Sequence, residues 1–112
     1  MSNLFFFAGI CSAIQLSIKP TGKIFLTKTD LQLRCKCYIY PLGTYVWTKD
    51  GKEVATDARV TISRNKLYIN NATVGDSGEY SCSATTQDGS DIRRATSPLS
   101  VTVVGEYLVY NL

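Results

Sequence analysis

Short stretches in which apolar and polar residues alternate recur along most of the chain. In residues 31–39, for example, Leu31, Leu33 and Cys35 recur with a period of two, which places their side chains on one face of a β-strand. Similar stretches, separated by turn residues at 20–22, 50–51 and 88–89, predict strands over residues 14–19, 23–27, 31–39, 45–49, 59–63, 66–70, 79–85 and 95–104. Apart from a single turn near residues 74–77, no segment predicts a helix. The pattern therefore predicts an all-β protein.

The same parity predicts core residues in two neighbouring strands. Val60 and Ile62 share one face of the strand over residues 59–63, and Leu67 and Ile69 share one face of the next strand. We expect these four side chains to point inward, because an antiparallel sheet commonly buries one face and leaves the other in solvent.

The most specific pattern in the chain joins two cysteines, a tryptophan and a tyrosine. Trp47 lies 12 residues after Cys35, Cys82 lies 47 residues after Cys35, and Tyr80 precedes Cys82 by two positions. This layout resembles the immunoglobulin fold. Residues 76–82 resemble the D-x-G-x-Y-x-C signature of the I-set and V-set branches, and residues 49–51 and 67–72 are more similar to the I-set. The resemblance spans about residues 14–104 and is strongest to immunoglobulin domains of neural cell adhesion molecules.

This resemblance implies a fold and structural roles for several residues. The fold is an immunoglobulin-like β-sandwich of two antiparallel sheets, of the I-set type, in which a disulfide between Cys35 and Cys82 crosses the sandwich and Trp47 packs on it. Tyr80 sends its hydroxyl back to the corner before its strand. Arg59 stands where such domains carry an arginine that pairs with the signature aspartate, here Asp76. These roles are structural rather than binding roles.

The other two cysteines leave alternatives open. Four cysteines allow three pairings, and Cys37 follows Cys35 by two positions, so its side chain is expected on the same inward face. We predict a free, buried thiol that acts as a small apolar side chain. The alternative is a disulfide with Cys11 or with another chain. A stable disulfide between Cys35 and Cys82 indicates an oxidising compartment, which means secretion or the extracellular face of the cell surface.

Composition divides the chain into three parts. The apolar run over residues 4–11, followed by Ser12 and Ala13, predicts a signal peptide over residues 1–13 that is cleaved after Ala13. The alternative is the remnant of a truncated upstream sequence. The resemblance implies that residues 14–104 form the I-set domain, and we expect residues 105–112 to be a linker or a carboxy-terminal tail. Because no apolar run approaches the ~20 residues of a transmembrane helix, we predict no membrane-spanning segment in this chain.

Charge and composition disfavour several classes of function. The 112 residues carry a formal net charge of +3, and the basic residues are scattered, with no run longer than Arg93 and Arg94. Nucleic-acid binding is therefore disfavoured. The chain contains no histidine, which removes the commonest general base and the commonest zinc ligand. We predict no enzyme activity, no catalytic or metal-binding residues and no cofactor.

One N-glycosylation sequon, Asn71-Ala72-Thr73, lies between the strands over residues 66–70 and 79–85. In a secreted chain we expect Asn71 to carry a glycan on a surface turn. The alternative is that Asn71 only caps the turn by hydrogen-bonding nearby backbone.

Outward positions of the predicted sandwich indicate where a partner binds. Parity places five uncharged side chains on the outer face of the strands over residues 45–49 and 79–85, namely Val46, Thr48, Ser81, Ser83 and Thr85. Arg93 and Arg94 flank this face from the hairpin at residues 87–94, and arginine is enriched in protein interfaces. The alternative for this surface is an ordinary solvated face.

Together, the resemblance and the surface favour a non-enzymatic protein-binding or adhesion module, secreted or on the cell surface. The resemblance implies a protein partner, often a second copy of the same chain, and we expect a weak homo-oligomer or a monomer. Two alternatives stay open. One is an intracellular structural I-set module of a muscle-type multidomain protein, with reduced cysteines, and the other is a soluble decoy or immune effector.

Overall fold

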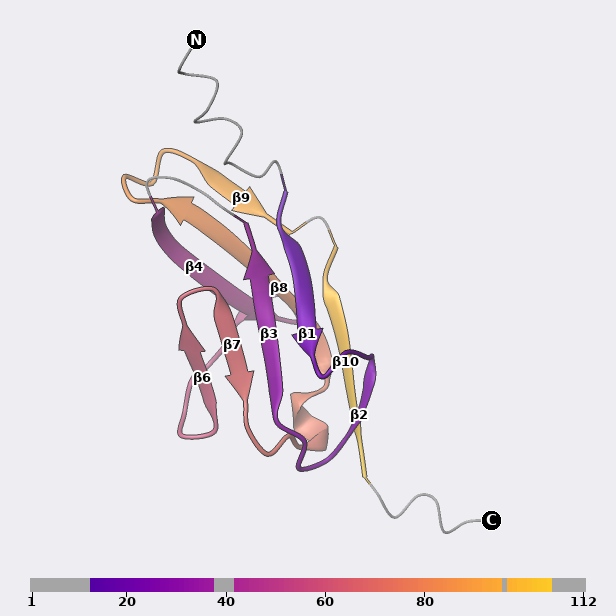
Figure 1. Ribbon diagram of the computed structural model, residues 1–112. Helices are drawn as coiled ribbons and strands as arrows, with labels where there is room; N and C mark the ends of the chain where they lie inside the picture. The colour runs from indigo at the N-terminus through magenta and orange to yellow at the C-terminus, as the bar shows by residue number, and fades with distance from the viewer. Residues whose placement is uncertain (1–12, 38–41, 96, 106–112) are drawn as a thin grey trace.

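Two β-sheets pack face to face in the computed structural model, which describes residues 13–37, 42–95 and 97–105 (Figure 1). The first sheet has the order β1-β3-β7-β6, with strands β1 (Gln15–Lys19), β3 (Leu31–Lys36), β7 (Lys66–Ile69) and β6 (Val60–Ser63). The second sheet has the order β2-β10-β8-β4-β5, and β9 also pairs with β8. Its strands are β2 (Ile24–Leu26), β10 (Leu99–Val104), β8 (Gly78–Thr86), β4 (Leu42–Lys49), β5 (Lys52–Glu53) and β9 (Ile92–Arg94). A single turn of 3-10 helix, η1 (Val74–Asp76), precedes β8.

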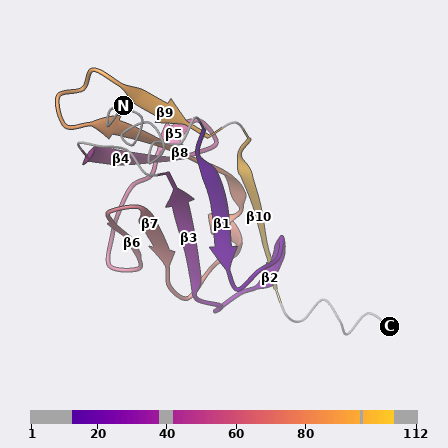
Figure 2. The same ribbon diagram turned by 45° about the horizontal axis from the view of Figure 1, so that its top comes forward.

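The predicted sandwich of two sheets is confirmed. Figure 2 shows the strands of the first sheet as one layer and β4, β8 and β9 as another. Neighbouring strands run antiparallel, except that β2 runs parallel to β10 with Leu26 opposite Val104. The expectation of purely antiparallel sheets is therefore corrected at this one strand pair.

The end of the second sheet differs from the prediction of one strand over residues 95–104. Within that range the structure has only β10, which pairs with residues 78–80 of β8, and a separate strand, β9, lies before it and pairs with residues 83–85 of β8. Pro98 lies between the two strands and has no backbone N–H to donate to the sheet, so regular pairing resumes only at Leu99.

The predicted turn at Asp50 and Gly51 is present between β4 and β5. Both residues have a positive φ, of 52° and 81°, which the common two-residue hairpin turn requires. A carboxylate oxygen of Asp50 accepts the backbone N–H of Glu79 at 2.9 Å, which ties the turn to β8. The apolar pattern did not predict β5, because both of its residues, Lys52 and Glu53, are charged and exposed.

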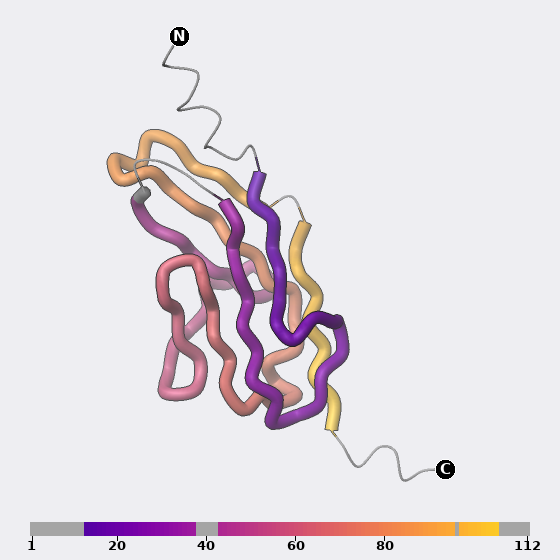
Figure 3. The backbone as a smooth tube through the Cα atoms, viewed as in Figure 1, coloured from indigo at the N-terminus to yellow at the C-terminus, as the bar shows by residue number. Residues whose placement is uncertain are grey.

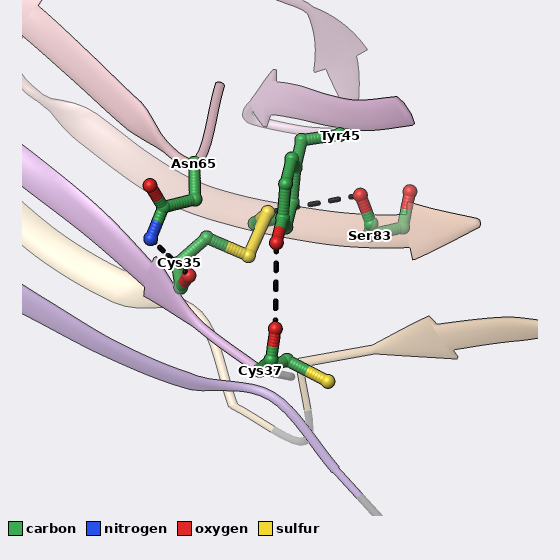
Figure 4. Close-up of a disulfide and its surroundings, with 6 residues drawn as sticks. Cys35, Cys37, Tyr45, Asn65 and Ser83 are labelled. Carbon is green, nitrogen blue, oxygen red and sulfur yellow. Dashed lines mark hydrogen bonds between the residues drawn. A yellow bond between two sulfur atoms is a disulfide. The ribbon is translucent and has the colours of Figure 1, made fainter. Parts of the chain in front are cut away.

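The core lies between the sheets and is centred on Trp47 of β4, which is 1% exposed. Trp47 lies opposite Cys82 on β8, and Cys82 is bonded to Cys35 on β3 with the two Cα atoms 6.2 Å apart. This disulfide joins the two sheets, as Figure 4 shows. Other buried side chains surround it: Ile18, Phe25, Leu31, Leu33, Val60, Leu67, Ile69, Tyr80, Ala84, Val101 and Val103. Within the described residues, the indole N–H of Trp47 has no hydrogen-bond acceptor.

The prediction that Cys37 is a free, buried thiol is wrong. Cys37 is half-buried and disulfide-bonded, and no described cysteine is free. It follows the last residue of β3 and packs only partly against the core, and its carbonyl accepts the Tyr45 hydroxyl at 3.4 Å (Figure 4). Cys35 and Cys82 are bonded to each other, so neither is the partner of Cys37. The predicted alternative partner, Cys11, lies outside the described residues.

Ile62 also departs from its predicted inward position. Val60, Leu67 and Ile69 are buried as predicted, but Ile62 is 36% exposed. It lies on β6, the edge strand of the first sheet, and lines a shallow groove beside Gly43, Thr44, Tyr45 and Arg64. Parity directs Ile62 toward the other sheet, but the sandwich is not closed at this edge.

The described chain enters and leaves the sandwich at opposite ends of its long axis, as Figure 3 shows. The predicted signal peptide and the predicted tail lie almost entirely outside the described residues. Within the described part, no helix is both long and apolar enough to cross a membrane.

Candidate protein-binding face

Four side chains on β4 and β8 point away from the core and form the centre of one surface. Antiparallel pairing places Val46 opposite Ser83 and Thr48 opposite Ser81. Trp47, which lies between the two β4 residues, is buried in the core, so parity turns the four side chains outward. Each of the four is half-buried, because its neighbours on the sheet cover part of it.

On the other side of β8, β9 extends this surface. Arg94 lies opposite Ser83, and Ile92 lies opposite Thr85, which in turn faces Thr44 on β4. Both β9 residues are exposed. We call these eight residues the β4–β8–β9 face: Thr44, Val46, Thr48, Ser81, Ser83, Thr85, Ile92 and Arg94.

The structure does not place Arg93 on this face, although the sequence assigned it there together with Arg94. Arg93 stands opposite Ala84, whose side chain is fully buried, and successive residues of a strand point to opposite sides. It forms an ion pair with Asp91, two positions earlier on the same side of the chain. The sequence predicted a loop at residues 87–94, and a loop carries no parity that would have separated the two arginines.

Ile92 and Thr44 are members of the face that the sequence analysis missed. Ile92 was assigned to the hairpin loop, and its spacing of two from Arg94 was the only signal that pointed to a strand. Thr44 and Gly43 lie between the strands predicted over residues 31–39 and 45–49. In the structure the register shifts between Leu42 and Thr44, and a side chain at Gly43 would clash with the carbonyl oxygen of Thr85.

The β4–β8–β9 face carries little charge, since Arg94 is the one ionisable residue among its eight members. Two carboxylates border it, from Glu53 opposite Thr48 and from Glu79, which accepts a hydrogen bond from the hydroxyl of Ser100. A surface of this kind loses little hydration energy when a protein partner covers it.

At the end of the sandwich where η1 lies, Arg59 and Asp76 form a two-point ion pair. The two guanidinium nitrogens of Arg59 lie 2.7 and 3.2 Å from the two carboxylate oxygens of Asp76. Asp76 also accepts the backbone N–H of Thr73 at 2.8 Å, and its own backbone carbonyl accepts the Tyr80 hydroxyl at 2.6 Å. Charge-assisted contacts of this geometry fix the corner between η1 and β8.

These contacts change the acidity of two groups. Burial by itself would raise the pKa of Asp76, but the hydrogen bonds from Arg59 and Thr73 outweigh it and hold the pKa below its ordinary value. Burial raises the pKa of the Tyr80 hydroxyl, and the negative charge of Asp76 adds to this effect. Asp76 is therefore charged and Tyr80 is neutral at neutral pH.

We expect Asp76→Asn to lower the free energy of unfolding by about 1–2 kcal/mol at neutral pH, because charge-assisted hydrogen bonds become neutral ones. The folded state lowers the pKa of Asp76, so its contribution is fully present above the ordinary pKa of 3.8 and is lost as the pH falls through the lower folded value. The difference between wild type and variant should therefore shrink as the pH falls below about 4.

Urea titrations across this pH range measure that difference. Glu53→Gln, which neutralises an exposed carboxylate on β5, is the matched control and should change the urea midpoint little at any pH. A variant as stable as wild type at neutral pH would show that the ion pair does not stabilise the fold, and a difference that does not shrink below about pH 4 would show that it does not depend on the charge of Asp76.

Asn71 lies on the exposed turn between β7 and η1. It has a positive φ of 57°, which asparagine tolerates better than most residues, and its backbone N–H donates to the Asp30 carboxylate at 2.8 Å. The hydroxyl of Thr73, the third sequon residue, donates to Asp76 at 3.3 Å. Glycosylation of Asn71 stays a prediction.

Comparison with known proteins decides the family. Residues 15–86 match the model of the immunoglobulin domain family. The chain belongs to this family. The resemblance inferred from the two cysteines, Trp47 and Tyr80 is therefore confirmed at the level of the immunoglobulin domain.

Relatives of this immunoglobulin domain are much longer proteins. It is 38% identical to contactin of Drosophila melanogaster over 56 residues, which cover 50% of this chain and 4% of contactin. It is 37% identical to the muscle M-line assembly protein unc-89 of Caenorhabditis elegans over 83 residues, which cover 70% of this chain and 1% of that protein. The chain thus spans only a few per cent of the length of these relatives. The solved structure of murine CEACAM1b matches 85% of this chain and 45% of its own, with a TM-score of 0.69 at 16% identity, which shows a shared fold.

Proposed function

We propose that this immunoglobulin domain is an extracellular protein-binding module of the adhesion or recognition type, without enzyme activity, and that it contacts its partner through the β4–β8–β9 face. The observation that carries this proposal is the low charge of that face across three strands, with Ile92 and Arg94 at its margin. Exposed apolar side chains and arginine are typical of residues that anchor protein interfaces.

A second copy of this chain is the partner that the face fits best. In a two-fold symmetric dimer the same patch meets itself, so a strongly charged face would bring like charges together. The β4–β8–β9 face avoids this repulsion, because its central residues Val46, Thr48, Ser81 and Ser83 are uncharged. The small size of these side chains favours a close but weak contact.

Three observations support an extracellular location. The Cys35–Cys82 disulfide crosses the core, and such bonds persist mainly in secreted and cell-surface proteins. Cys37 is disulfide-bonded as well. The sequon at Asn71 lies on an exposed turn, where there is room for an N-linked glycan.

The similarity to unc-89 favours the alternative of an intracellular structural module of muscle. In that compartment Cys35 and Cys82 would stay reduced. Counting free thiols on protein from its native source separates the two locations.

The proposal predicts that Thr48→Arg combined with Ser83→Glu abolishes self-association. Both side chains lie near the centre of the face, so each substitution buries a new charge in the contact. Sedimentation velocity of wild type and variant over a range of concentrations measures the association. The urea midpoint should stay nearly unchanged, because surface substitutions usually alter stability by no more than ~0.5 kcal/mol.

Ser17→Glu combined with Thr61→Arg is the matched control, since both residues are exposed on the outer face of the first sheet. This variant should associate like wild type. Association that survives the Thr48 and Ser83 substitutions, or that is lost in the control instead, would place the contact on the other sheet.

A further inference from the structure

The first sheet gathers basic residues that are far apart in the sequence. Its outward positions alternate with the buried residues Ile18, Leu33 and Leu67, and ten of them follow from parity: Gln15, Ser17, Lys19, Gln32, Arg34, Lys36, Thr61, Ser63, Lys66 and Tyr68. Four of these are basic and none is acidic. We call Lys19, Arg34, Lys36 and Lys66 the basic face.

Strand register brings these charges close together. Arg34 on β3 stands directly opposite Lys66 on β7, and directly opposed residues on neighbouring strands have Cβ atoms about 5 Å apart. Lys36 follows Arg34 on the same side of β3, roughly 7 Å along the strand. Lys19 occupies the next row of the sheet, opposite Gln32.

The fold itself does not neutralise this cluster. Among the described residues, the side-chain ion pairs join Arg59 to Asp76 and Arg93 to Asp91, and neither pair involves the basic face. Like charges placed directly opposite each other on a sheet are destabilising. A surface that retains four such charges and has no acidic residue at its ten outward positions is complementary to a polyanion.

We propose that the basic face binds a linear sulfated polysaccharide, a proposal that rests on the extracellular location given under the proposed function. Sulfate groups repeat along such a chain, and the basic residues repeat in rows across β1, β3 and β7. Tyr68 is the one aromatic residue among the ten outward positions, whereas single-stranded nucleic acid is held by several stacked aromatics. It offers no exposed apolar side chain to enter a lipid surface.

The basic face and the β4–β8–β9 face lie on opposite outer surfaces of the sandwich, so a polysaccharide and a protein partner do not compete for one site. A glycan at Asn71 would lie nearer to Lys19, which shares a row with Gln32 and Tyr68, than to the row of Arg34 and Lys66. Lys66 begins β7, and Asn71 follows the opposite end of that strand.

The test is isothermal titration with a heparin octasaccharide at about 0.15 M salt. The variant Arg34→Gln, Lys36→Gln, Lys66→Gln removes three charges from the basic face. The matched control Lys23→Gln, Lys28→Gln, Lys52→Gln removes three exposed charges elsewhere. We expect the basic-face variant to bind at least about tenfold more weakly than wild type and the control to lose no more than about threefold, because contact with several fixed cations releases counterions and depends steeply on their number. Equal losses in the two variants would overturn the proposal.

Three further probes fix the class of ligand. Fully desulfated heparin should bind far more weakly than the sulfated octasaccharide. Tighter binding to duplex DNA or to vesicles rich in phosphatidylserine would overturn the proposal in favour of those ligands.

The basic-face variant should unfold at the same or a higher urea concentration than wild type, since opposed like charges are removed.

The same variants separate this proposal from the proposed function. In sedimentation velocity, the basic-face variant should associate like wild type. Loss of octasaccharide binding in Thr48→Arg with Ser83→Glu, and retention in the basic-face variant, would overturn the assignment to the first sheet. Octasaccharide binding by a wild-type protein that never self-associates would contradict the homophilic function and support the polysaccharide site.

Discussion

Replacing Trp47 with alanine is expected to lower the free energy of unfolding by about 3–5 kcal/mol. Trp47 has the largest side chain among the fully buried residues and lies opposite Cys82 at the centre of the core. Alanine would remove its apolar contacts with both sheets and leave a cavity that the disulfide prevents from closing. Urea titration followed by far-ultraviolet circular dichroism measures the loss.

Two controls make this result specific. Trp47→Phe should cost less, because phenylalanine fills part of the cavity and removes an indole N–H that has no acceptor among the described residues. Thr48→Ala changes the neighbouring, outward side chain and should stay within about 0.5 kcal/mol of wild type. A loss under ~1 kcal/mol for Trp47→Ala would mean that Trp47 does not hold the core together.

Removing the central disulfide by Cys35→Ala with Cys82→Ala is expected to cost about 2–5 kcal/mol. The bond closes a loop across a sequence separation of 47 residues, for which the chain-entropy model gives roughly 4 kcal/mol. The disulfide raises the free energy of unfolding mainly because the unfolded chain loses conformational freedom when the two cysteines are joined. Native domains are stable by only ~5–15 kcal/mol, so this loss is a large part of the total.

The measurement compares wild type and the double variant in urea without reductant. Adding a reductant to wild type would also break the bond at Cys37, and the double variant isolates the Cys35–Cys82 contribution. If the double variant is unfolded even without urea, its circular dichroism spectrum will show the loss of β-structure directly. Equal stability of the two proteins would show that packing alone holds the sheets together.

Local parity predicted the core well because it depends only on the strand period. Leu31, Leu33 and Cys35 are buried as their alternation requires, and Trp47 is buried opposite Cys82 of the disulfide. Their positions follow from residues near each other in the sequence or from a spacing that the whole family shares.

Other features depend on how distant strands are paired, which a single sequence does not contain. Arg93 and Arg94 were grouped together because the pairing of β9 with β8 could not be read from their order in the chain. Lys66 and Arg34 are scattered in the sequence, but the register of β3 and β7 places them side by side. Ile62 has inward parity, yet the open edge at β6 leaves it exposed.

The break between β9 and β10 divides the strand pairing along one side of β8 into two parts of different strength. β10 is held on both sides, by β2 and by β8, whereas β9 has only three paired positions with β8 and a bridge from Ile14 to Ala95 beside it. Short, exposed segments with few buried contacts open locally at low free-energy cost. The amide protons of β9 should therefore exchange with solvent faster than those of β10. Ile92 and Arg94 can then adjust to the shape of a partner while Thr48 and Ser81, next to the Trp47 core, stay fixed.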